Sequence, residues 1–253
     1  MKKITLAFLT SISLTTLVLL TSCSTTTEPS EAYKGESPEQ IFTKGQQSLR
    51  DRDYSESIKR FEALEVQYPF GQNAEKAQLY LIYAYYKKEE YALSIAEADR
   101  FIRAYPASPQ VSYAYFMRGL ANYYQGQGVF ERFFPIDMAT RDLTQLKKSY
   151  QDFSELVQHF PNSPYAPAAY QYMIYLRNLL ANHQLQVAQY YYSRKAYVAA
   201  VNRASGVVAN YQGAPAVRPA LELMLNSYHE LGLPQAERDV RRVMYNNIQG
   251  DPR

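Results

Sequence analysis

Residues 54–106 read YSESIKRFEALEVQYPFGQNAEKAQLYLIYAYYKKEEYALSIAEADRFIRAYP, and this stretch contains one pattern twice. The second copy lies 37 residues after the first (91 minus 54), and every internal spacing is kept. The recurring residues are Tyr54, Ser57, Ile58, Tyr68 and Pro69 in the first copy and Tyr91, Ser94, Ile95, Tyr105 and Pro106 in the second. Apolar residues three or four positions apart within each copy predict an amphipathic helix with one buried face. Because proline ends each helix, the stretch predicts a structural repeat.

A second helical stretch precedes each copy. Ile41–Leu49 leads into the first copy and Ala77–Lys87 into the second, each through a short polar turn. Each unit is therefore predicted to be a helical hairpin, and its length, turn tyrosine and terminal proline resemble the tetratricopeptide pattern. A hairpin of this size cannot bury its apolar face alone, so such units stack into a solenoid with a curved binding surface.

Repeat three is interrupted by an insertion. Gly119 and Leu146 are 27 residues apart, whereas the matching positions in repeat two, 82 and 91, are 9 apart, which leaves 18 additional residues. These correspond roughly to Gln125–Asp142. The insertion carries an apolar cluster of Phe130, Phe133, Phe134 and Ile136. Exposed aromatic residues in a long loop are unfavourable, so we expect the cluster to pack back on the solenoid rather than to be covered by a partner.

The following part of the chain begins with a long helical pattern. No glycine or proline occurs between Pro167 and Ala199, which allows one helix of about 30 residues and about 45 Å. The alternative is a break at Asn182 and His183, which would separate an extra helix from the first helix of repeat four. Either arrangement gives repeat four an extended first half.

The predicted fold is all-α, a tetratricopeptide-repeat solenoid of five helical hairpins, with an insertion in repeat three and an extended first helix in repeat four. Ser37 is suited to the N-cap and Pro38 to the first helical position of repeat one. Repeats one to three are expected in residues 38–161 and repeats four and five in residues 162–249. Residues 250–253 are expected to form a frayed tail.

The N-terminus has the features of an exported lipoprotein. Lys2 and Lys3 precede a short apolar run, so residues 1–22 are predicted to be a signal peptide. Leu20-Thr-Ser-Cys23 resembles a bacterial lipobox, which makes Cys23, the only cysteine, the expected lipidation site. A free thiol beside an ordinary cleavage site is the alternative. Residues 23–37 are polar and are expected to form a disordered tether.

Composition and motifs argue against several function classes. Without the leader lysines the formal charge is 25 minus 24, or +1, so nucleic acid is not expected as a partner. The sequence contains no GxxxxGK, GxGxxG, GxSxG, HExxH or CxxC motif. Its three histidines, His159, His183 and His229, lie in separate repeats without companion ligands. We expect no enzyme activity, cofactor or metal.

Aromatic residues recur on the first helices of repeats one to three, at spacings of three, four or seven. In tetratricopeptide folds, such positions line the concave face, and tyrosine is suited to binding peptides because it is apolar with a polar tip. The alternative is that these residues only fill space between hairpins. The candidate groove residues are Phe42, Leu49, Tyr83, Tyr86, Tyr113, Phe116 and Tyr123.

The whole mature chain resembles the BamD family, outer-membrane lipoproteins of the β-barrel assembly machinery. The most specific part is Tyr175-Leu-Arg-Asn-Leu-Leu-Ala, followed by Val187-Ala-x-Tyr-Tyr and Ala196-Tyr-Val-Ala-Ala-Val-Asn-Arg203. The absence of aspartate after Cys23 fits delivery to the outer membrane. Gln212 departs from the family pattern, because a proline usually ends repeat four.

The resemblance implies a lipid-anchored scaffold on the periplasmic face of the outer membrane. Its C-terminal repeats would bind the POTRA domains of BamA, with Arg203 matching the family arginine at that contact, and other lipoproteins of the complex would be partners. Its N-terminal repeats would recognise unfolded outer-membrane proteins. The alternatives are another tetratricopeptide lipoprotein, such as a pilus-assembly pilotin or an envelope-constriction factor, and a periplasmic hydrolase, which no residue pattern supports.

Overall fold

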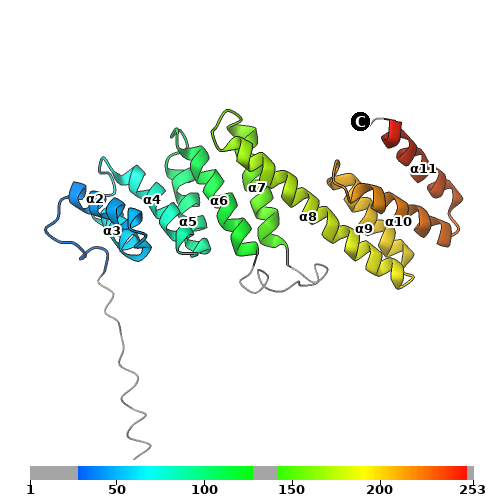
Figure 1. Cartoon of the computed structure of the whole chain (residues 1–253), viewed down its shortest axis with the longest axis horizontal. Helices are drawn as coiled ribbons and strands as arrows, with labels where there is room; N and C mark the ends of the chain where they lie inside the picture. Colours follow the sequence, from blue (N-terminus) through cyan, green and yellow to red (C-terminus); the bar gives the residue numbers. More distant parts are fainter. Residues whose placement is uncertain (1–27, 128–141, 250–253) are drawn as a thin grey trace, which may run out of the picture.

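The computed structural model describes residues 28–127 and 142–249, and most residues in this part of the chain are helical. Its ten described helices form five successive hairpins, which stack side by side into an elongated solenoid (Figure 1). The hairpins are α2 (Pro38–Arg50) with α3 (Tyr54–Gln67), α4 (Ala74–Lys87) with α5 (Tyr91–Ala104), α6 (Val111–Gly126) with α7 (Thr144–His159), α8 (Ala166–Ser193) with α9 (Tyr197–Asn210), and α10 (Val217–Glu230) with α11 (Pro234–Gln249). The predicted all-α solenoid is confirmed.

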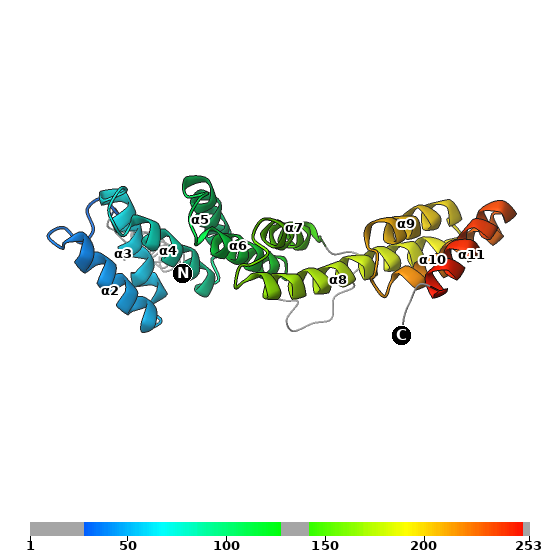
Figure 2. The same ribbon diagram turned by 90° about the horizontal axis from the view of Figure 1, so that it is seen from above.

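The first helices of neighbouring repeats approach one another. Besides the packing of consecutive helices, α2 contacts α4, α4 contacts α6, and α8 contacts α10. From repeat two onward, Figure 2 shows α6 and α8 along one side of the solenoid and α5, α7 and α9 along the other. The first helices therefore form the inner layer, which places their side chains where an extended ligand could lie.

The start of the solenoid is fixed by a capping box. The Ser37 hydroxyl accepts from the Gln40 backbone N–H at 3.2 Å, and the Gln40 side chain accepts from the Ser37 N–H at 2.9 Å. Pro38 occupies the first turn, where its missing N–H costs nothing. The structure thus begins α2 where the sequence predicted.

The turns inside four of the five hairpins share one backbone conformation. At Arg52, Glu89, Lys195 and Gly232, φ is between 60° and 65°. The next residue donates its N–H to a carbonyl five positions earlier, as in Asp53 to Ser48 and Glu90 to Tyr85. This is the Schellman arrangement that satisfies the last carbonyls of a helix. Glycine adopts it at least cost, but only repeat five uses glycine there.

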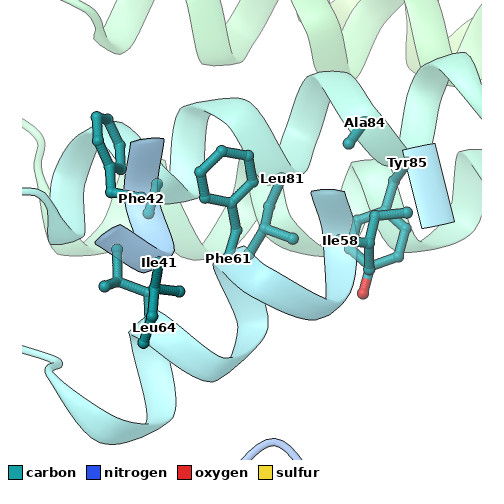
Figure 3. Close-up of a cluster of buried hydrophobic side chains, with 9 residues drawn as sticks. Ile41, Phe42, Ile58, Phe61, Leu64, Leu81, Ala84 and Tyr85 are labelled. Atoms are coloured by element: carbon teal, nitrogen blue, oxygen red, sulfur yellow. The ribbon is translucent and has the colours of Figure 1, made fainter. Parts of the chain in front are cut away.

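In the first three hairpins, the interface between the two helices matches a small residue with a larger one. A Cβ on Gly45 would lie 2.9 Å from the Phe61 ring, and a Cβ on Gly119 would lie 2.7 Å from the Phe153 ring. Repeat two reverses the sizes, because Ile82 and Ala98 are the fully buried residues at the same register. The first core cluster, which includes Ile41, Ile58, Phe61 and Leu81, is drawn in Figure 3. The combined volume of the two facing residues, rather than their identity, is therefore kept between these repeats.

Helix α8 is continuous through Asn182 and His183 and runs for 28 residues. Its first half packs Leu176 and Leu180 into a core shared with α7, and its second half packs Leu185 and Ala188 into a core shared with α9 and α10. The question left open by the sequence is settled in favour of one helix, because both halves have a packed apolar face. Helix α8 therefore joins the three N-terminal repeats to the two C-terminal ones (Figures 1 and 2).

The segment 28–37 differs from the expected disordered tether. It forms successive turns that pack on repeat one, and its Tyr33 lies against the first core cluster. Polar composition was a poor guide here, because one tyrosine and several side-chain bonds hold the backbone. The leader, Cys23, most of the insertion with its phenylalanines, and the tail 250–253 lie outside the described residues.

Candidate partner-binding surfaces

The seven candidate groove residues occupy three different environments. Phe42 is only 9% exposed and packs in the first core, with its ring centroid 5.9 Å from that of Phe61 and 5.8 Å from that of Tyr80. Leu49 is half-buried against the same core. The expectation that all seven line an open groove is therefore corrected for Phe42, which packs against α3 and α4.

Tyr83, Tyr113 and Phe116 lie further along the inner layer. Tyr83 is 36% exposed, whereas Tyr113 and Phe116 are half-buried. The ring of Tyr165, at the start of α8, lies 5.5 Å from that of Tyr113 and stacks on Phe116 at 5.3 Å between centroids. Burial raises the pKa of the Tyr113 phenol, so the hydroxyl stays protonated.

Tyr86 and Tyr123 belong to a larger group that we call the tyrosine cluster. Its members come from repeats two, three and four: Tyr86, Tyr91, Tyr123, Tyr124, Tyr172 and Tyr175. The centroid distances between contacting rings run from 5.1 Å for Tyr123 and Tyr124 to 6.1 Å for Tyr123 and Tyr175. Most rings are half-buried, but Tyr175 is 49% exposed. The cluster presents phenol groups and ring edges at the inner layer.

Sequence reasoning missed the contribution of α8 to this surface. Tyr172 and Tyr175 are three residues apart on one helix face, the same spacing that marked the stripes of repeats one to three. The signal was present, but the sequence left open whether the first half of α8 is a separate, extra helix. Because α8 is continuous, its N-terminal half extends the aromatic surface beyond repeat three.

A buried polar network between repeats two and three also had no sequence signal. Arg118 on α6 lies 2.6 Å from Asp99, 2.7 Å from Asp152 and 2.9 Å from Glu155. Asn122 donates to Asp152 at 2.7 Å. These residues line a hollow of about 490 Å³. One arginine holding carboxylates from α5 and α7 fixes the angle between the two repeats.

The environment of Asp152 is unusual for a carboxylate. Burial raises its pKa to about 6, and Arg118 beside it opposes that rise. Burial likewise raises the pKa of Glu65 to about 7, although Arg100 pairs with it across two helices. Desolvation exceeds the effect of the nearby positive charge in both cases.

Arg203, which the family resemblance assigns to the partner contact, lies on the exposed face of α9. It forms no ion pair with any residue in the described ranges, and its neighbours Ala204 and Val207 face the core. Nearby, Arg177 donates to the Gly213 carbonyl at 3.1 Å and so braces the turn between α9 and α10. Arg177 therefore has a structural partner, whereas Arg203 points its charge outward.

The histidines do not converge on a site. His229 lies 3.6 Å from Glu237, and the His159 ring contacts Phe160. Across residues 28–127 and 142–249, no group of three or more His, Cys, Asp or Glu side chains is arranged to hold a metal. None of the helices in these ranges combines the length and apolar character that a membrane span requires. The surfaces of interest are therefore the inner aromatic layer and the outer face of α9.

Comparison with known proteins decides the family. A family model described as "YfiO: Outer membrane lipoprotein" matches residues 34–243, most of the chain. The chain belongs to the YfiO family. The Vibrio cholerae relative named "Outer membrane protein assembly factor BamD" is 37% identical over 210 residues, which cover 83% of this chain and 87% of the relative. The Neisseria meningitidis protein of the same name is 36% identical over 216 residues, which cover 85% and 81%.

Solved structures add a distant match. The structure titled "Crystal structure of MamA protein" has a TM-score of 0.37 and 13% identity, over 82% of this chain and 90% of that one. Membership of the YfiO family rests on the sequence matches instead.

Proposed function

We propose that this protein is a non-enzymatic scaffold for outer-membrane protein assembly, anchored by lipid to the periplasmic face of the outer membrane. The observation that carries the proposal is the match to outer membrane protein assembly factors over more than four-fifths of both chains. The solenoid supports it, because stacked hairpins offer two separate surfaces to partners. The inner aromatic layer serves substrate, and the outer face of α9 serves the complex.

The anchor in this proposal is a lipidated Cys23. Replacing it with serine is expected to leave an uncleaved precursor that carries no acyl label, because the lipobox enzyme requires the thiol. Palmitate labelling and mass measurement of the purified protein give the answer. Cleavage and labelling of the Cys23→Ser variant would rule out this anchor.

The contact with the complex in this proposal is an ion pair between Arg203 and an acidic residue on a POTRA domain of BamA. Arg203→Glu is expected to weaken co-purification with the POTRA-bearing barrel and to leave the melting temperature nearly unchanged, because Arg203 forms no ion pair within residues 28–127 and 142–249. Losing one member of a desolvated interface pair costs about 2 kcal/mol or more, whereas an exposed pair contributes at most about 1 kcal/mol.

The matched control is Arg103→Glu. Arg103 is also an exposed arginine on a second helix, but in repeat two, and it has no ion pair among the described residues. It should leave co-purification intact. Equal loss in both variants would indicate a nonspecific charge effect, and no loss in either would remove Arg203 from the interface.

The substrate surface in this proposal is the inner aromatic layer of repeats one to three, extended by α8. Strands of outer-membrane barrels alternate apolar and polar residues, so one apolar face of an extended segment can lie along the aromatic rings. Among the candidate groove residues and the tyrosine cluster, Tyr83 and Tyr175 have the most exposed side chains.

A double Tyr83→Ala, Tyr175→Ala variant is expected to retain its melting temperature and to lose crosslinking to a barrel C-terminal peptide. Phe42→Ala is the contrasting variant, because Phe42 is core and its loss should mainly lower stability by about 3–5 kcal/mol. Unaltered crosslinking by the tyrosine variant would refute the proposed surface. Tyr175 is preferred to Tyr123 in this variant, because Tyr123 contacts the rings of Tyr124, Tyr172 and Tyr175.

A further inference from the structure

The segment 28–37 holds the start of the described chain firmly against repeat one. The Arg60 guanidinium lies 4.1 Å from the centroid of the Tyr33 ring, and the Tyr33 hydroxyl donates to Glu56 at 3.0 Å. Glu36 pairs with Lys44 at 3.0 Å and with Arg60 at 3.1 Å. Burial and the bond to Glu56 raise the pKa of Tyr33 to about 12, so this donor persists at all physiological pH values. The segment is a fixed part of the fold.

Gln67 determines where the chain leaves the solenoid toward Cys23. This side chain, in the last turn of α3, donates its amide to the carbonyls of both Pro29 and Ala32 at 2.8 Å. Cys23 precedes Pro29 by six residues, and an extended chain spans at most about 3.5 Å per residue, or about 20 Å here. A lipid on Cys23 would thus hold the C-terminal end of α3 close to the membrane surface.

An exposed apolar tip lies at the same end of α3. Phe70 is 100% exposed and Val66 is 56% exposed. The turn that carries Phe70 is closed by a hydrogen bond of 3.0 Å from the Gly71 N–H to the Tyr68 carbonyl. Phe70 follows Gln67 by three residues, which is about 10 Å at most. The tip is therefore no farther from the pinned segment than the lipid tether can reach.

A single exposed apolar residue needs no explanation by itself, but this pair has a specific location. An aromatic side chain on a short loop can enter the boundary between headgroups and acyl chains, where its apolar surface leaves water. Val198, by contrast, is exposed on α9, which belongs to the C-terminal part of the solenoid (Figure 1). The tether length therefore keeps the repeat-one end, which carries Val66 and Phe70, close to the bilayer.

We propose that Val66 and Phe70 form a membrane-contacting tip that docks repeat one on the lipid surface beside the anchor. This inference rests on the proposed lipidation of Cys23. A lipid and an apolar contact at one end restrict the tilt of the solenoid. The α9 face and the inner aromatic layer then extend away from the membrane toward their partners.

The chain offers a direct test, because it contains no tryptophan and one cysteine. The mature chain from Cys23 is coupled through its thiol to maleimide lipid in vesicles of phosphatidylethanolamine and phosphatidylglycerol. With Phe70→Trp, brominated acyl chains should quench about half of the tryptophan emission, since an interfacial side chain reaches roughly 5–10 Å into the boundary. The emission maximum should also shift to shorter wavelength.

Val198→Trp is the matched control, because Val198 is 61% exposed but lies on α9. It should show neither quenching nor a shift in the same vesicles. Absence of quenching at Phe70, or equal quenching at both positions, would overturn the proposal. The proposal would also be overturned if the Phe70→Trp emission changed only when a POTRA-bearing protein was added. The tip would then contact protein rather than lipid.

Chemical coupling separates this inference from the proposed function. If cells do not lipidate Cys23, the labelling experiment fails while the coupled vesicles still report whether the tip enters lipid. If the tip does not enter lipid, labelling of Cys23 and co-purification through Arg203 are unaffected.

Discussion

The three N-terminal repeats and the two C-terminal repeats solve the same packing problem with different side chains. The N-terminal cores are built around Phe61, Phe101 and Phe153, with tyrosines between the hairpins. The core between α8, α9 and α10 consists largely of alanine and valine. Large rings leave partly exposed edges that a ligand can use, whereas small residues let helices approach closely and present smooth outer faces.

The two regions also differ in how charges link their helices. In the N-terminal repeats, Arg100 bridges α3 and α5, and Arg118 bridges α5, α6 and α7. In the C-terminal repeats, the described ion pairs of arginine lie within single helices, as for Arg218 with Glu222. Arginine ion pairs therefore connect neighbouring helices in the N-terminal part, whereas the C-terminal part leaves Arg203 available to a partner.

Truncating one core residue in each region tests this comparison most strongly. Phe153→Ala is expected to lower the free energy of unfolding by about 3–5 kcal/mol, because it leaves a large cavity. Val207→Ala, equally buried in the C-terminal core, should cost only about 2 kcal/mol for its two methyl groups. Urea unfolding of both variants measures the difference. Similar losses would show that the two cores are packed alike.

The Arg118 network makes stability depend on pH. Because the pKa of Asp152 is about 6 when folded and 3.8 ordinarily, the folded state binds more protons between these values. The free energy of unfolding contributed by Asp152 therefore falls as pH rises from about 4 to 6, by roughly 2–3 kcal/mol. Asp152→Asn should remove this dependence of the free energy of unfolding on pH. Glu65 is present in both the wild-type protein and the variant, so its contribution to the pH dependence is the same in both. Parallel stability curves for the two proteins would contradict the assignment.

Two helical glycines distinguish the regions by available space. Gly119→Ala would place a Cβ 2.7 Å from Phe153 and is expected to cost about 1–3 kcal/mol. Gly206 on α9 has nothing within 4 Å of its added Cβ, so Gly206→Ala should stabilise by up to about 1 kcal/mol through helix propensity. Thermal unfolding of both variants measures whether each substitution raises or lowers stability. A stabilising Gly119→Ala would mean that the Phe153 ring can move freely.

The smallest expected effect concerns the hairpin turns. Gly232→Ala in repeat five should cost about 1 kcal/mol, because φ is +65° there. Glu89→Gly in repeat two should stabilise slightly, since relief of the positive φ exceeds the added freedom of the unfolded chain. If neither substitution changes the melting temperature, the turns relax on substitution and their shared positive-φ conformation carries no strain.

The sequence predicted the fold well where its signal is local and repeated. The periodic apolar positions, the prolines and Ser37 located five hairpins to within a few residues, because helix periodicity and capping depend on neighbouring residues. The candidate site was predicted less completely. Phe42 and Tyr83 occupy related stripe positions, yet one is core and the other surface, since the neighbouring hairpin decides which ring it covers.

What the sequence determined by itself was the repeat and its helical hairpins. These follow from spacing along one chain. Only the tertiary structure decided that α8 is continuous, that Arg118 gathers Asp99, Asp152 and Glu155, and that residues 28–37 pack on α3. These depend on contacts between residues distant in sequence, whose free energy comes from desolvation and packing that no local pattern encodes.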